Sequence, residues 1–132
     1  MDIEVFFEDG MKVNARIGNH IIKTDQRADG GGEDTAPEPF DYFLSSLATC
    51  AGIYVKVFCN RRGIDPSKIK LIQKQIRDDV THKLSAINLE IIVPEDFPEK
   101  YRAAVAAAAN QCTVKRLIAD PPAINVSVTP VS

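Results

Sequence analysis

The three cysteines are the strongest nucleophiles in this sequence, and their positions decide what chemistry each could do. Cys112 falls where the pattern predicts the start of a short helix capped by Asn110. Backbone N–H groups without partners there, together with the helix dipole, favour a thiolate over a thiol. Equally, Cys112 could be a small buried apolar residue. The sequence leaves both interpretations of Cys112 open.

Cys50 and Cys59 belong to a longer predicted helix. Cys50 lies in its middle, where the dipole contributes little, so a reactive thiolate there needs a cation or a hydrogen-bond donor from elsewhere in the protein. Without one, Cys50 is an inert core residue. Cys59 lies about 13.5 Å further along the helix axis, which is too far for a disulfide with Cys50. A disulfide within the chain would therefore have to include Cys112.

Other kinds of catalytic or binding site have little support. The two histidines, His20 and His82, are remote from the cysteines in sequence, and neither a C-x-x-C nor an H-x-x-x-H spacing occurs, so no metal site is predicted. No G-x-S-x-G motif is present. The glycines at 30–32 form no phosphate-binding pattern, and a hinge is the better interpretation of them. We therefore expect no cofactor.

Composition narrows the class of protein. Lys and Arg number 16 against 18 Asp and Glu, with a net charge of -2, whereas nucleic-acid binders usually carry a basic excess. The apolar run at 40–58 contains Asp41, Lys56 and several hydroxyl side chains, which favours a buried helix over a membrane span. No leader pattern opens the chain, and an odd number of cysteines argues against a disulfide framework. We expect a cytoplasmic protein.

Periodicity places the cysteines among strands and helices. Apolar and polar residues alternate through residues 3–24, which predicts an antiparallel meander of three strands. Residues 25–37 are rich in glycine and acids and lack apolar periodicity, so we expect a mobile loop there. From Pro39 apolar residues recur every three or four positions, which predicts a helix that ends near Gly63.

The second half continues this mixed pattern. Residues 68–79 and 83–93 predict a β-hairpin, Asp96 is a candidate cap for a second helix, and residues 124–128 predict a final strand. A chain of 132 residues fits one compact core. The expected fold class is therefore α+β, as a single domain over residues 1–132.

Two motifs carry a resemblance to a known family. The stretch from Pro39 to Ala51, PFDYFLSSLATCA, opens the predicted central helix and contains Cys50. The second motif, Gln111-Cys112-Thr113-Val114, is similar to a Cys-Pro-Val pattern at the start of a late helix. These motifs and the order of elements resemble the OsmC/Ohr family over nearly the whole chain. The resemblance implies an OsmC-like fold, with antiparallel sheets around a long central helix in an intertwined homodimer.

The resemblance also implies peroxidase chemistry at the matched cysteines. Cys50 would be the peroxidatic residue, oxidised by an organic hydroperoxide to a sulfenic acid, and Cys112 the resolving residue that forms a disulfide with it. A dithiol partner would reduce that disulfide. The family's helix-start carboxylate, a Glu, is matched here by Asp41, with Glu38 less well aligned.

One basic residue of the family pattern has no direct match. Peroxidase members pair the carboxylate with an Arg after the first strand, where this chain reads Phe7-Glu8-Asp9-Gly10. Arg16 or Arg27 would have to fold into that place, because burial without a nearby cation disfavours a thiolate at Cys50. Two alternatives stay open. One is a non-catalytic dimer that binds a small apolar ligand in an interface pocket lined by the cysteines, and the other is a purely structural domain.

Overall fold

In the computed structural model, which describes residues 1–131, the predicted N-terminal strands form an antiparallel meander. The strands are β1 (Ile3–Phe7), β2 (Val13–Ile17) and β3 (His20–Thr24), in the order β1-β2-β3. Val5 pairs with Ala15, and Ala15 with Ile22, so one face of this sheet is apolar. The expected three-stranded meander is confirmed.

Residues 25–37 form the expected loop, which is held together by hydrogen bonds, and its expected mobility stays a prediction. Its centre is Asp25, which is only 1% exposed. The Asp25 carboxylate accepts hydrogen bonds from the N–H groups of Gln26, Glu33 and Thr35, and at 2.6 Å from the Thr35 hydroxyl. Gly32 is required by close approach rather than as a hinge, because a Cβ there would overlap the Gln26 carbonyl. Composition could not show that one acid turns inward and gathers these donors.

The long helix α1 (Pro39–Arg61) has the start and end that the sequence predicts. Pro39 occupies its first position, and the Asp41 carboxylate accepts a hydrogen bond of 3.1 Å from the Glu38 N–H, which is half of a capping box. Gly63 adopts a φ of 65°, and the Ile64 N–H returns to the Cys59 carbonyl at 2.9 Å. This is a Schellman C-cap, and a left-handed glycine makes it possible without strain.

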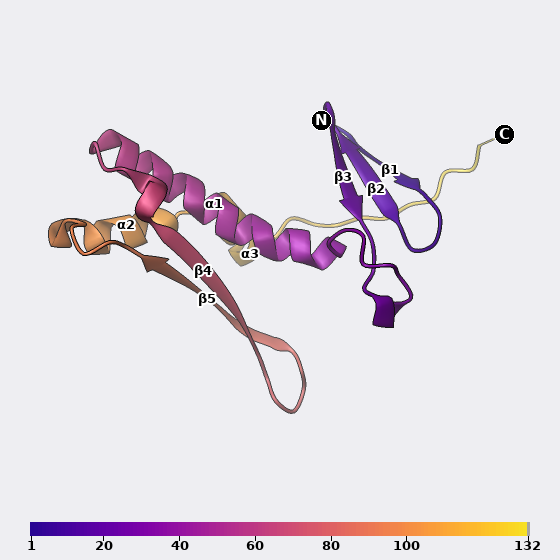
Figure 1. Cartoon of the computed structure of the whole chain (residues 1–132). Coiled ribbons are helices and arrows are strands. Elements are labelled where there is room, and N and C mark those ends of the chain that lie inside the picture. Colours follow the sequence, from indigo (N-terminus) through magenta and orange to yellow (C-terminus); the bar gives the residue numbers. More distant parts are fainter. Residues whose placement is uncertain (132) are drawn as a thin grey trace. The chain divides into compact units, whose positions relative to one another are not determined.

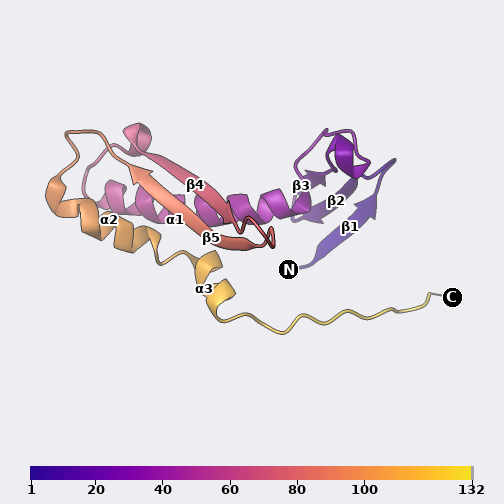
Figure 2. The same ribbon diagram turned by 90° about the horizontal axis from the view of Figure 1, so that it is seen from below.

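The chain divides into two compact units, Met1–Ser46 and the residues from Leu47 onward. In the second unit, β4 (Lys70–Arg77) and β5 (Leu84–Ile92) form an antiparallel hairpin that lies along α1, and α2 (Arg102–Ala109) lies beside them (Figure 1; Figure 2). The fold is α+β with two antiparallel sheets, as expected. The single domain over residues 1–132 stays a prediction.

The core of the second unit is built on α1. Its buried side chains are Ala51, Val55, Phe58 and Cys59 of α1, with Phe97, Val105 and Ala109. Inward residues of the hairpin, such as Leu71 and Leu89, pack against this cluster. Among residues 1–131, α1 is the one helix long and apolar enough to cross a membrane by length and composition alone. Of the apolar window that passes this test, 22% is buried.

Two helix starts differ from the sequence expectation. Asp96 caps no helix, because it lies in a turn before Pro98, and a 3-10 turn (Glu99–Tyr101) leads into α2. Asn110 ends α2, with its N–H bonded to the Ala106 carbonyl, instead of capping the next helix. The following helix α3 (Thr113–Ala119) has Cys112 as its N-cap residue. Cys112 therefore lies just before the helix and not within it.

The final strand expected at 124–128 is absent, because residues 121–131 have no regular structure. They extend away from α3 (Figure 2). A strand needs an edge to pair with, and this segment pairs with none within residues 1–131. Its apolar side chains are left exposed, Ile124 at 87% and Val126 and Val128 at 92%.

Candidate active site

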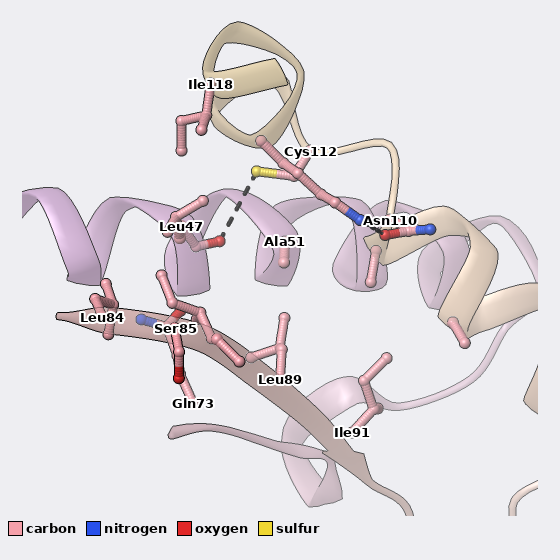
Figure 3. A pocket seen from close by; sticks show the side chains of 15 residues that line it. Leu47, Ala51, Gln73, Leu84, Ser85, Leu89, Ile91, Asn110, Cys112 and Ile118 are labelled. Carbon is pink, nitrogen blue, oxygen red and sulfur yellow. Dashed lines mark hydrogen bonds between the residues drawn. The ribbon is translucent and has the colours of Figure 1, made fainter. Parts of the chain in front are cut away.

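The structure brings Cys50 and Cys112 together, although they come from α1 and from the start of α3. Their thiols lie close enough that each shifts the pKa of the other. The Cys112 S–H also donates a weak hydrogen bond of 3.8 Å to the Leu47 carbonyl, one turn before Cys50 (Figure 3). None of the three cysteines of residues 1–131 is in a disulfide. The predicted pair is thus present as two adjacent thiols.

The surroundings of Cys50 favour its thiolate. The pKa of Cys50 is lowered, chiefly by the backbone N–H of Val114 and then by the Cys112 thiol. Burial opposes this shift, while the Thr113 N–H and the charge of Arg116 add to it. The donor that a mid-helix cysteine needs is therefore supplied by the first turn of α3.

The surroundings of Cys112 favour its neutral thiol. Cys112 is 2% exposed, and burial is the main cause that raises its pKa. The neighbouring Cys50 raises the pKa further, against lowering by the N–H groups of Lys115 and Val114. Cys112 is therefore held as a neutral thiol, whose S–H donates to the Leu47 carbonyl. Of the two interpretations left open for Cys112, the structure favours the small buried residue: Cys112 precedes a helix start, but burial keeps it a thiol.

Cys59 takes no part in this pair. It is fully buried in the core of the second unit, on the same unbroken helix as Cys50. Burial raises the pKa of the Cys59 thiol, so it stays neutral. A neutral, enclosed thiol is chemically inert.

Asp41 and the candidate arginines lie in the first unit. Besides capping α1, Asp41 forms an ion pair with Arg27, with 3.8 Å between Oδ1 and Nη2. Glu38 accepts a hydrogen bond from the Arg27 backbone N–H. Arg16 instead pairs with Glu4 at 3.6 Å. Arg27, not Arg16, therefore accompanies the helix-start carboxylate, and a role of Asp41 in catalysis stays a prediction.

A pocket of about 510 Å³ lies in the second unit (Figure 3). Its lining is mostly apolar, with Leu47 and Ala51 from α1, Leu84, Leu89 and Ile91 from the hairpin, and Ile118 from α3. Lys115 and Asn110 line it as well and form a hydrogen bond with each other. Cys112 lines this pocket, whereas Cys50 is not among its lining residues. The pocket at a dimer interface that both cysteines would line stays a prediction, because this pocket lies within one chain.

Sequence reasoning missed the residues that surround the thiol pair. Val114 and Thr113 act through backbone N–H groups, which no side-chain pattern reveals. Arg116 could have been found as a cation four positions after Cys112, one turn along a helix. Within residues 1–131 no group of three or more His, Cys, Asp or Glu side chains could hold a metal ion.

Comparisons with known proteins agree on one family. The OsmC-like protein family model matches residues 31–127. A Psychrobacter arcticus protein, described provisionally as osmotic stress induced and involved in detoxification, has a similar structure, with a TM-score of 0.72, 20% identity and coverage of 86% of this chain and 85% of that one.

Two further crystal structures are similar. The OsmC-like protein of Mycoplasma pneumoniae gives a TM-score of 0.69 at 18% identity, with 91% of this chain and 87% of that one covered. The organic hydroperoxide resistance protein OsmC of Legionella pneumophila gives 0.55 at 16% identity, with 89% and 87% covered. At such identities the likeness shows the fold alone. No curated protein sequence matches the chain.

Proposed function

Because the chain belongs to the OsmC-like family, we propose that it is a thiol peroxidase that reduces organic hydroperoxides, with Cys50 as the peroxidatic and Cys112 as the resolving residue. One observation carries this proposal. Two adjacent thiols have pKa values shifted in opposite directions, downward at Cys50 and upward at Cys112. A peroxidatic cysteine must be a thiolate, whereas a resolving cysteine can wait as a thiol.

The reaction balances with a hydroperoxide and a dithiol as co-substrates. The Cys50 thiolate attacks the terminal oxygen of ROOH, the O–O bond breaks, and the alkoxide takes up a proton and leaves as ROH. The Cys112 thiol then loses its proton and attacks the Cys50 sulfenic acid, and water leaves as the S–S bond forms. A dithiol reductant restores both thiols by exchange and becomes a disulfide itself. Such a cycle suits the reducing cytoplasm that we propose as its location.

We also propose that the protein acts as a homodimer. On α1, Ile53 is 60% exposed, and Val57 is exposed as well, so one face of a long apolar helix has no cover from residues 1–131 of the same chain. Apolar side chains at 124–128 are uncovered too. A second copy of the chain would bury both surfaces, and burial of apolar area is the main force for such association.

Rapid mixing with cumene hydroperoxide, followed by mass spectrometry, tests the proposed reaction. We expect a sulfenic acid on Cys50 in the Cys112→Ala variant and a Cys50–Cys112 disulfide in the native protein. Cys50→Ser should lower the rate of peroxide loss at least about 100-fold. Cys59→Ser is the matched control and should keep the native rate. Oxidation at Cys59 alone, or a native rate in Cys50→Ser, contradicts the proposal.

A second candidate function is the binding of a small apolar ligand without chemistry. The observation that favours it is the 510 Å³ pocket, whose lining includes Cys112 but not Cys50. Ligand binding there does not require the Cys50 thiolate. Fluorescence of 1-anilinonaphthalene-8-sulfonate measures binding to this pocket. If the protein binds an apolar ligand there, Cys50→Ser should bind the probe as the native protein does. Leu89→Asn, which changes the lining, should weaken binding about tenfold. Equal binding by Leu89→Asn contradicts it.

A further inference from the structure

A second link joins the same two elements that carry the thiols. The Tyr54 and Thr113 hydroxyl groups form a hydrogen bond of 3.1 Å. Tyr54 lies one helical turn after Cys50 on α1, and Thr113 directly follows Cys112. Because residues four apart share a helix face, Tyr54 and Cys50 present their side chains to the same segment. The Cys112–Leu47 hydrogen bond and the Tyr54–Thr113 hydrogen bond are therefore two neighbouring links between α1 and the start of α3.

Packing alone fixes α3 weakly. None of the seven residues of α3, Thr113–Ala119, is buried, and Leu117 is 56% exposed. The buried anchor of this region is Cys112, immediately before the helix. A short helix without buried side chains has little packing to hold its first turn in place. A hydrogen bond at Thr113, the first residue of α3, acts where that support is missing.

We propose that Tyr54 is a positioning residue of the thiol pair, which holds Thr113 and so keeps Cys112 and the first turn of α3 against Cys50. The inference rests on the proposed pairing of Cys50 with Cys112 and adds the residue that sets its geometry. Tyr54 touches neither sulfur in this role. The Tyr54 hydroxyl raises the effective concentration of the Cys112 thiol at Cys50. A thiol that is already held in place loses less conformational freedom when the disulfide forms.

Equilibration with glutathione measures this effect without any peroxide. Glutathione disulfide accepts two electrons from the Cys50 and Cys112 thiols, their S–S bond forms, and two glutathione molecules are released as thiols. The equilibrium constant reports the effective concentration of the two cysteines. We expect Tyr54→Phe to lower it about fivefold, which corresponds to the loss of one ordinary hydrogen bond. Thr113→Val should lower it by a similar factor.

The double variant identifies the bond itself. If Tyr54 and Thr113 act through each other, the double variant should lower the equilibrium constant no further than either single variant. Tyr42→Phe is the matched control, because Tyr42 is also on α1 and its hydroxyl donates a 2.7 Å hydrogen bond to the Lys23 carbonyl, in the first unit. That variant loses a bond of the same kind and should leave the equilibrium constant within twofold of native.

A second measurement separates positioning from a general loss of stability. Displacement of the first turn of α3 takes the Val114 and Thr113 N–H groups away from Cys50, so Tyr54→Phe should raise the pKa of Cys50, read from the pH dependence of its alkylation. Partial unfolding would instead expose Cys59 to alkylation.

The possible results separate this inference from the proposed function. A native equilibrium constant in Tyr54→Phe, an equal drop in Tyr42→Phe, or no Cys50–Cys112 disulfide in the native protein overturns the positioning role. A fivefold drop in a protein that fails to consume hydroperoxide supports the positioning role and overturns the peroxidase alone.

Discussion

At the scale of single residues, Cys50 and Cys112 have the same side chain, yet their surroundings move their pKa values in opposite directions. The motifs could predict which cysteines pair. They could not predict why the two pKa values differ. The N–H that lowers the pKa of Cys50 belongs to Val114 on α3, and the burial of Cys112 depends on packing. Backbone donors have no sequence signature of their own.

The lowered pKa of Cys50 predicts its order of modification. As the pH rises, the Cys50 thiolate appears first, so iodoacetamide at pH about 7 should alkylate Cys50 before Cys112 and Cys59. Peptide mass spectrometry over a pH series measures this order. In Cys112→Ala the pKa of Cys50 should rise but stay below the ordinary thiol value, because the Val114 N–H remains. Modification of Cys112 first would contradict the assignment of roles.

Asp41 caps α1, and as the match to the family's helix-start carboxylate it is also a predicted catalytic residue, a role that a rate measurement tests. Asp41→Asn removes a capping carboxylate and the Arg27 ion pair, and this should lower the free energy of unfolding by about 0.5–1 kcal/mol. If Asp41 also serves the reaction, oxidation of Cys50 should slow about tenfold or more. Glu38→Gln tests the less well aligned match in the same way, and Asp29→Asn, at an exposed position of the preceding loop, is the control. A native rate with only the stability loss would restrict Asp41 to the cap.

At the scale of elements, α1 could be predicted well and the loop before it could not. Pro39, Asp41 and Gly63 are local signals for a helix start and end, and the structure uses each of them that way. The loop depends on Asp25 turning inward, and one acid among several in a glycine-rich segment looks the same in sequence whether it faces solvent or the interior. The direction that Asp25 takes is decided by the donors that the fold gathers around it.

The hydrogen bonds to the Asp25 carboxylate predict that the stability of the protein depends on pH. Hydrogen bonds from Thr35 hold the pKa of Asp25 at about 2, below the value of about 4 expected in the unfolded chain. A folded pKa below the unfolded one stabilises the protein fully above pH about 4, and this contribution is lost as the pH falls towards 2. Urea unfolding between pH 5 and 2 should therefore show a steeper loss of stability in the native protein than in Asp25→Asn.

The substitution should also weaken the loop at neutral pH. Asp25→Asn replaces one acceptor oxygen by an amide that faces N–H donors, so the melting temperature should fall by several degrees. Asp29→Asn, in the same loop but exposed, should change neither the melting temperature nor the acid slope. If the native protein and Asp25→Asn lose stability equally as the pH falls from 5 to 2, the hydrogen bonds to Asp25 do not stabilise the loop.

At the scale of the whole molecule, the alternating residues at 124–128 predict a strand that residues 1–131 of one chain do not form. The alternation predicts which side chains of the strand are buried. It does not predict which strand pairs with it. A partner edge on a second copy would account for both the pattern and its exposure, because strand pairing satisfies the backbone and buries Ile124, Val126 and Val128 together.

The apolar side chains at 124–128 therefore predict that the protein is a homodimer. In solution, light scattering after gel filtration should give twice the 14.5 kDa of one chain. The pair Ile124→Asn and Val126→Asn should shift the mass towards one chain, because each replaces an apolar side chain that the partner would bury. Asn125→Ala with Ser127→Ala changes the opposite face of the same segment and should keep the dimer. A dimer that survives the first pair would place the interface on another surface, with the exposed α1 face at Ile53 as the next candidate.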